Sequence, residues 1–186
     1  MAGEIYKTAI KGDKSFSNIL KGNDYLFIAI LFLLSFVVYI KTLCPTVYEG
    51  DSGEILAAVA SLGIAHPTGF PLYILLSRLF AIIIPFKDIA YSVNLLSAFF
   101  ASLSAGVIYL GLRTLAINRP VSFGAALSFA FSATLWSHAT AARVYTLAGF
   151  FIALLLWIIF QKRLHLKIVS TGLNIITALV GIPYNI

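Results

Sequence analysis

Three acidic residues fall within a run of six positions, Glu49-Gly-Asp51-Ser-Gly-Glu54. Carboxylates on a glycine-bearing turn can deprotonate a hydroxyl as general bases, or they can hold a cation. The spacing of Asp51 and Glu54 is also typical of a capping box, in which both side chains cap the first turn of a following helix. We predict that Asp51 and Glu54 are catalytic residues and that Glu49 binds the substrate. A capping role for the same residues remains open.

A histidine lies in the proline- and glycine-bearing segment that follows this run. His66 stands between Gly63 and Pro71, with Pro67 and Gly69 in between. Such residues favour a turn without regular secondary structure, on which His66 would present its imidazole. The alternative is a purely structural histidine. We carry His66 as a candidate substrate-binding residue.

A second polar segment, 136–146, contains His138, Arg143 and Tyr145. Trp136 at its start is typical of an aromatic anchor at a membrane interface. Arg143 has no acidic residue nearby in the sequence, and the planar fork of a guanidinium suits a phosphate group. We therefore expect His138, Arg143 and Tyr145 to contribute to substrate binding.

Composition indicates which elements must position these residues. Of the 186 residues, 60% are hydrophobic and 11% are charged, whereas about a quarter are charged in a typical soluble domain. This excludes a soluble domain and a disordered chain, and it predicts an all-α polytopic membrane protein. The net charge of +6 is interpreted as a mark of membrane topology, and no nucleic-acid partner is expected. The single cysteine, Cys44, forms no internal disulfide.

Apolar runs of the length that a bilayer requires predict about five transmembrane helices. They lie at 25–43, 91–112, 121–136, 145–160 and 168–182. Two shorter apolar segments, 52–62 and 72–84, are expected to be juxtamembrane helices. The second is too short to cross comfortably and is expected to lie along the membrane surface or to dip into it. In the second crossing, the spacing of Ser97, Ala101 and Ala105 predicts close helix packing.

The distribution of basic residues sets the expected orientation. If 72–84 does not cross, nine Lys and Arg residues fall on the side of the amino terminus and four on the other side. Because basic residues concentrate on cytoplasmic loops, segment 1–24 is predicted to be cytoplasmic. The loops 44–90 and 137–144 are then extracytoplasmic, and residues 25–186 form one transmembrane module. The predicted crossings carry no charge away from their ends, which counts against a small transporter.

Two stretches of the chain resemble a known family. The run Thr-Val-Tyr-Glu-Gly-Asp-Ser-Gly-Glu-Ile-Leu-Ala-Ala at 46–58, with its continuation at 62–73, resembles the domain-of-unknown-function-2723 family. Residues 136–147 are similar to the tryptophan-to-V-Y-T-L segment of the same family. This family belongs to the GT-C superfamily of membrane glycosyltransferases and contains glycosyltransferase family 117 and the transmembrane protein 260 group, which is protein O-mannosyltransferase-like.

The resemblance implies a fold and an activity. The fold is a GT-C-like amino-terminal module whose first extracytoplasmic loop carries two juxtamembrane helices. The activity is transfer of a sugar, such as mannose, from a polyprenyl-phosphate donor in the membrane lipid to a hydroxyl of a protein or glycan acceptor. By this likeness Asp51 is the catalytic base, and Glu54 and His66 line the site. Arg143, Arg78 or a divalent metal would then neutralise the lipid phosphate.

Two features depart from the family. The position before Val144 is usually acidic in the family, whereas here it is Arg143, which points to a changed donor or acceptor. The family also has seven or more crossings, and this sequence predicts about five. We therefore expect an incomplete module that requires a second polypeptide or a longer reading frame. The alternative is a non-catalytic membrane subunit or a degenerate remnant of such an enzyme.

Overall fold

The computed structural model describes residues 22–67, 69–84 and 88–162. This part of the chain is all-helical, as the sequence predicts, and contains no strand. Its seven helices are α2 (Gly22–Lys41), α3 (Ser52–Ser61), α4 (Pro71–Ile83), α5 (Ile89–Thr114), α6 (Arg119–Ala130), α7 (Ala133–Ala139) and α8 (Tyr145–Lys162). The predicted fifth crossing at 168–182 and the lysines that precede Gly22 lie outside the described residues.

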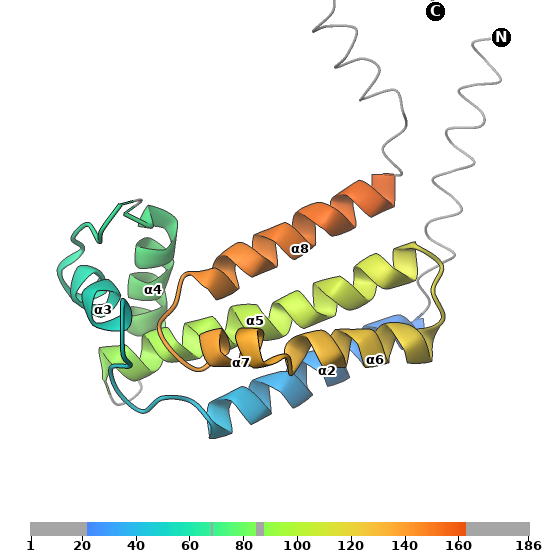
Figure 1. Ribbon diagram of the computed structural model, residues 1–186, viewed down its shortest axis with the longest axis horizontal. Coiled ribbons are helices and arrows are strands. Elements are labelled where there is room, and N and C mark those ends of the chain that lie inside the picture. Colours follow the sequence, from blue (N-terminus) through green and yellow to red (C-terminus); the bar gives the residue numbers. More distant parts are fainter. Residues whose placement is uncertain (1–21, 68, 85–87, 163–186) are drawn as a thin grey trace, which may run out of the picture.

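Helix α5 is the centre of the bundle, where it contacts α2, α4, α6, α7 and α8 (Figure 1). The small residues Ser97, Ala101 and Ala105 are fully buried on it, which confirms the predicted close packing. Gly106 contributes in the same way, because a Cβ at this position would lie 3.2 Å from the side chain of Ile28 on α2. The side chains at the centre are small, so the neighbouring helices can approach α5 closely.

Among the described residues, two helices are long and apolar enough to cross a membrane, α2 and α5. Helix α8 is also apolar, over the shorter stretch Tyr145–Phe160. The prediction of a single helix over 121–136 is wrong, because the chain turns at Phe131 and Ser132 and forms α6 and α7 instead. The Ser132 hydroxyl accepts a hydrogen bond from the Leu135 N–H and caps α7. Helix α6 has 12 residues and is about 18 Å long, which is short for a bilayer core.

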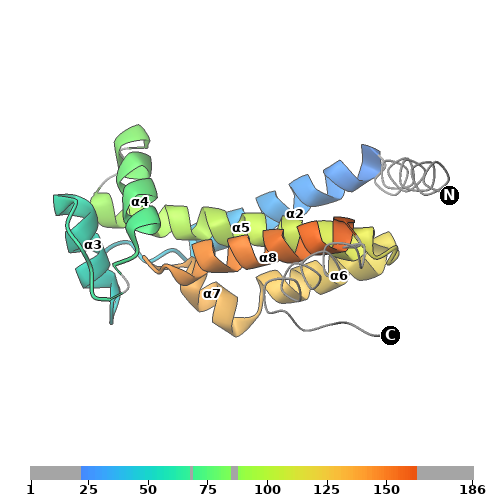
Figure 2. The same cartoon turned by 90° about the horizontal axis from the view of Figure 1, so that it is seen from above.

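Helices α3 and α4 lie together at one end of the bundle (Figures 1 and 2). Helices α2 and α5 run antiparallel, so the chain that joins them stays at this end. Helix α4 has 13 residues and lies across the direction of α5 in both views instead of running beside it. This arrangement agrees with the prediction that 72–84 does not form a further crossing beside the others.

A core of buried side chains fixes α3 and α4 to this end of the bundle. It joins Val59 of α3, Tyr73 of α4, Val93 of α5 and Leu147 of α8, each at most 5% exposed. The Tyr73 hydroxyl lies 2.8 Å from the Ser97 hydroxyl of α5, and both are buried. Helices α3, α4, α5 and α8 therefore share one buried core at this end of the bundle.

Candidate active site at the α3 and α4 end

The two loops that carry the polar motifs are joined by hydrogen bonds. Asn94 of α5, fully buried, donates from Nδ2 to the carbonyl oxygens of Cys44 and Thr46, at 2.8 and 3.0 Å. The Cys44 N–H donates to the carbonyl oxygen of Thr140 at 2.9 Å. Segments that are far apart in the sequence thus lie side by side, and they bring the first predicted loop against the second.

Arg143 is the point at which the two loops meet through side chains. Its guanidinium carbon lies 5.5 Å from the centre of the Tyr48 ring, an arrangement that attracts a cation to the ring face. The Arg143 backbone N–H donates to the buried Ser97 hydroxyl at 3.4 Å. Its Nε is buried and has no hydrogen-bond partner among the described residues. A buried donor without a partner is costly, so this atom is suited to a ligand that supplies an acceptor.

His138 lies beside Arg143 and packs on Tyr145. The two ring centres, of His138 and Tyr145, are 4.7 Å apart. Burial, and then the positive charge of Arg143, lower the pKa of His138 below its ordinary value. The imidazole is therefore neutral at neutral pH. Its Nδ1 is buried and lacks a partner within the described part of the chain, as the Arg143 Nε does.

Glu54 binds His66 through both of its carboxylate oxygens. Oε1 accepts from the His66 backbone N–H at 2.5 Å, and Oε2 lies 2.9 Å from His66 Nδ1. The bond to the imidazole, followed by the bond to the backbone, lowers the pKa of Glu54 below its ordinary value. The structure brings Glu54 and His66 into direct contact, and their place in a substrate site stays a prediction.

The alternative of a capping box is wrong for this structure. Asp51 is already in a helical conformation, with φ −65° and ψ −11°, and its side chain makes no cap bond. A capping side chain usually reaches back from an extended backbone, which Asp51 lacks. Glu54 points to His66 instead of to the start of α3. Gly50, with φ +76°, makes the sharp turn that precedes Asp51.

The remaining predicted site residues are not drawn into this network. Glu49 and Asp51 are exposed at the start of α3, and their carboxylates make no bond to a described residue. Arg78 lies half-buried on α4 and is not bonded to the other predicted site residues. In the described ranges, no group of three or more His, Cys, Asp or Glu side chains is placed to hold a metal ion. The three exposed acidic residues therefore separate into two without a described partner and one that binds His66.

Sequence reasoning missed Tyr48 as part of this site. Its contact with Arg143 joins positions 95 residues apart (143 − 48), and no local pattern reports such a pairing. The available signal was its place in the acidic run, next to Glu49.

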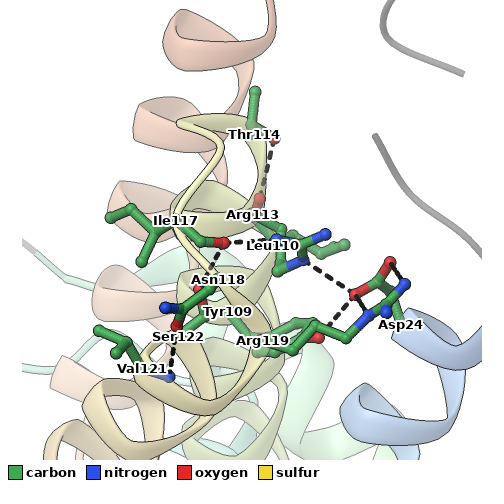
Figure 3. A network of polar contacts seen from close by, with 10 residues as sticks. All are labelled: Asp24, Tyr109, Leu110, Arg113, Thr114, Ile117, Asn118, Arg119, Val121 and Ser122. Carbon is green, nitrogen blue, oxygen red and sulfur yellow. Dashed lines mark hydrogen bonds and ion pairs between the residues drawn. The ribbon is translucent and has the colours of Figure 1, made fainter. Parts of the chain in front are cut away.

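Sequence reasoning also missed a buried charge cluster at the opposite end of the bundle (Figure 3). Asp24, 1% exposed, accepts hydrogen bonds from the Tyr109 hydroxyl at 2.7 Å and from Arg113 Nε at 2.9 Å. Arg119 binds the same carboxylate from Nε at 3.1 Å. The sequence placed Asp24 at the end of the polar segment 1–24, and nothing local indicated its partners.

The described chain is thus an all-helical bundle with helices fit to cross a membrane and a polar site where two loops meet at one end, as in helical membrane proteins that act at the membrane surface. A family model described as the protein O-mannosyl-transferase TMEM260 N-terminal domain matches residues 51–182. This range covers most of the chain, and the chain belongs to this family. The resemblance found from the sequence is confirmed. The matched range contains the candidate residues Asp51, Glu54, His66 and Arg143.

Two relatives show the extent of the similarity. The mouse protein O-mannosyl-transferase TMEM260 is 37% identical over 119 residues, which are 64% of this chain and 17% of the mouse protein. The Dictyostelium discoideum protein O-mannosyl-transferase tmem260 is 30% identical over 142 residues, 75% of this chain and 17% of the relative. The chain therefore spans about one sixth of the length of these relatives. No solved structure gives a significant match.

Proposed function

We propose that this chain acts in protein O-mannosyl transfer, as part of a membrane glycosyltransferase. In this proposal, mannose passes from a polyprenyl-phosphate donor to a hydroxyl of a protein acceptor on the extracytoplasmic side. The family match and the names of the relatives support the reaction class. The observation that carries the proposal is the meeting of the loop before Asp51 with the loop that holds Arg143, at one end of the bundle.

Arg143 is proposed to bind the phosphate of the donor. Its buried Nε has no partner among the described residues, and a phosphate oxygen would accept from it. The guanidinium lies over the Tyr48 ring, its carbon 5.5 Å from the ring centre, and in this proposal the phosphate meets the guanidinium at Nε. His138 is kept neutral by burial and by Arg143, so it adds a polar group without a second positive charge.

Asp51 is proposed to be the general base. Its carboxylate is exposed and is not used to cap α3. It would take the proton from the acceptor hydroxyl, whose oxygen attacks the anomeric carbon of the sugar while the bond from that carbon to the phosphate oxygen breaks. The electron pair leaves with the phosphate, and Arg143 stabilises the negative charge that develops there.

Binding of the donor lipid tests the proposal without requiring turnover. We expect the purified chain in nanodiscs to bind polyprenyl-phosphate mannose, and Arg143→Gln to weaken binding by about tenfold or more, the value of a charged hydrogen bond. Lys41→Gln is the matched control, because Lys41 is an exposed base at the end of α2. Equal weakening of donor binding by both variants would mean that the lipid responds only to the net charge of the chain and not to Arg143. Undiminished binding by Arg143→Gln would remove the phosphate assignment.

Transfer itself is tested with a radiolabelled donor and a serine- and threonine-containing peptide. We expect transfer to need both Asp51 and Arg143. Because the chain is expected to be an incomplete module, transfer is assayed with the longer reading frame or second polypeptide that completes it. Donor binding without any transfer in that complete, folded module would favour the alternative of a non-catalytic membrane subunit.

A further inference from the structure

The contact between Glu54 and His66 positions both the loop after α3 and the imidazole ring of His66. A bond from the Glu54 carboxylate to the His66 backbone N–H, at 2.5 Å, already fixes the segment after α3. The loop is fixed again by the Gly69 N–H, which donates to the His66 carbonyl at 2.7 Å, and by burial of Ala65. The second carboxylate oxygen lies 2.9 Å from Nδ1 and so binds the side chain of His66. What it fixes is the imidazole.

This bond determines which ring nitrogen carries the proton. The carboxylate of Glu54 is an acceptor only, because the bonds to His66 keep its pKa low and the group ionised. His66 Nδ1 must therefore be the donor. In the neutral imidazole, Nε2 is then left with its lone pair and is a hydrogen-bond acceptor. A carboxylate that fixes a histidine tautomer through Nδ1 is a recurring arrangement in sites where Nε2 meets a ligand.

The ring is held in place and its Nε2 has no partner in the described chain. The Phe70 ring meets the imidazole edge to face, with centres 5.3 Å apart. The His66 side chain is 38% exposed. The bonds of His66 to described residues use its backbone and Nδ1, not Nε2. A fixed imidazole with a free acceptor atom is suited to a neutral donor such as a hydroxyl.

We propose that His66 Nε2 accepts a hydrogen bond from a hydroxyl of the substrate, and that Glu54 is the positioning residue that holds His66 for this contact. The inference rests on the proposed function, because that function supplies substrates rich in hydroxyls. The hydroxyl belongs either to the sugar of the donor or to the serine or threonine of the acceptor. In the second case His66, and not Asp51, would receive the single O–H of the acceptor, and the test separates the two. Glu54 thereby changes from a catalytic candidate to a residue that acts through His66.

The tautomer is measured directly by NMR. The chain has three histidines, so ¹⁵N-histidine labelling gives few signals, and His66→Phe identifies those of His66. In the neutral imidazole we expect a protonated Nδ1 and an unprotonated Nε2. Glu54→Gln has nearly the same shape, but its amide N–H groups can face Nδ1, so we expect the proton to move to Nε2. A wild-type His66 with the proton on Nε2 would overturn the proposal.

Ligand contact is measured at the same nitrogen. Polyprenyl-phosphate mannose, polyprenyl phosphate without sugar, and a soluble serine- and threonine-containing peptide are added in separate samples. A shift of the Nε2 signal with the first lipid but not the second assigns the hydroxyl to the sugar, and a shift with the peptide assigns it to the acceptor. We expect His66→Phe and Glu54→Gln to weaken binding of that ligand about tenfold, and His66→Gln, which keeps an acceptor near the Nε2 position, to lose less.

The outcomes are separable from those of the proposed function. An Nε2 signal that none of the three probes moves overturns the hydroxyl contact, whatever the transfer assay gives. A signal that moves with the sugar lipid, while Arg143→Gln binds this lipid normally, overturns the phosphate assignment alone. A purely structural Glu54 would lower thermal stability in Glu54→Ala but would leave ligand binding unchanged in folded Glu54→Gln.

Discussion

Asp51 combines exposure with a side chain that the described fold does not use. Because its carboxylate makes no cap bond, replacement should not affect α3. We expect Asp51→Asn and Asp51→Ala to abolish sugar transfer, with expression near normal and stability within about 0.5 kcal/mol of wild type, as is usual for surface positions. Transfer is measured with radiolabelled donor, and unfolding by tryptophan fluorescence.

The neighbouring Glu49 supplies a comparison for Asp51, since it is also an exposed carboxylate without a described partner and is the candidate for substrate binding. Glu49→Gln should lower transfer by weakening substrate binding, without abolishing transfer as Asp51→Asn does. Turnover by Asp51→Asn comparable to wild type would remove Asp51 as the base. A marked loss of stability in Asp51→Ala but not Asp51→Asn would instead restore the capping role.

Arg143 and His138 form a pair whose charges are coupled. The positive charge of Arg143 is the second cause, after burial, of the lowered pKa of His138. Removal of that charge makes protonation of the imidazole easier, so we expect the pKa of His138 to rise in Arg143→Gln and to stay lowered in Arg143→Lys. An NMR titration of the His138 ring measures both. An unchanged or lower pKa in Arg143→Gln would show that the two side chains do not interact.

The residue types of the site could be predicted from the sequence, but their partners could not. Asp51, His66 and Arg143 stood out because carboxylate, imidazole and guanidinium groups are rare in so apolar a chain. The pairing of Tyr48 with Arg143 depends on how α5 holds the two loops together, which only the packed bundle determines. The local pattern predicted that Asp51 and Glu54 cap α3. In the structure the backbone at Asp51 is helical and its side chain makes no cap bond, and Glu54 binds His66 instead.

Three helices are joined by one buried carboxylate at the end of the bundle away from the candidate site (Figure 3). Asp24 of α2 binds Arg113 of α5 and Arg119 of α6, whose side chains are 12% and 30% exposed. A buried carboxylate shared by two guanidinium groups holds these helices in register. If the Asp24 carboxylate is neutralised, Arg113 and Arg119 remain charged and partly buried without a compensating negative charge.

We expect Asp24→Asn to destabilise the chain strongly, by about 3 kcal/mol, because breaking a buried ion pair leaves an uncompensated charge. Arg119→Gln should cost less, since Arg113 still pairs with Asp24. Asn23→Ala is the control, because Asn23 is exposed one position earlier. Thermal unfolding in detergent gives all three values. A midpoint for Asp24→Asn within a degree of the control would show that the cluster contributes nothing to stability.

Element boundaries followed the sequence where a local signal marks them. Helix α4 begins at Pro71 and ends at Ile83, close to the predicted 72–84, because prolines bracket it. The break between α6 and α7 was missed because the run through Phe131 and Ser132 stays apolar and lacks a proline or glycine. The Ser132 hydroxyl accepts from the Leu135 N–H and caps the start of α7. A single serine within an apolar run does not predict a helix start from sequence.

At the scale of the whole molecule, polar groups separate to opposite ends of an apolar bundle. Cys44, α3, α4 and Arg143 lie at one end, and Asp24, Arg113 and Arg119 lie at the other. This separation could be predicted, because apolar runs of bilayer length force polar loops to the two ends. The direction of the bundle in a membrane depends on the basic residues, including four lysines before Gly22.

We predict that the Cys44 end faces the extracytoplasmic side. The opposite end carries Arg113 and Arg119, and the four lysines precede α2, which begins at that end; basic residues favour the cytoplasmic side. Cys44 is the single thiol, so a membrane-impermeant maleimide should label it in intact cells. Because Cys44 is half-buried, two exposed positions, Val47 and Leu115, give firmer probes when each is changed to cysteine in a Cys44→Ser background.

Val47→Cys should label in intact cells and Leu115→Cys only after permeabilisation, because the two positions lie at opposite ends of the bundle. The Cys44→Ser chain without a thiol gives the background signal. The reverse pattern would place the proposed site in the cytoplasm, out of reach of a donor presented on the outer face, and would remove the extracytoplasmic part of the proposed function while leaving family membership intact. Labelling of both positions in intact cells would show that α2 and α5 do not separate the two ends across a membrane at all.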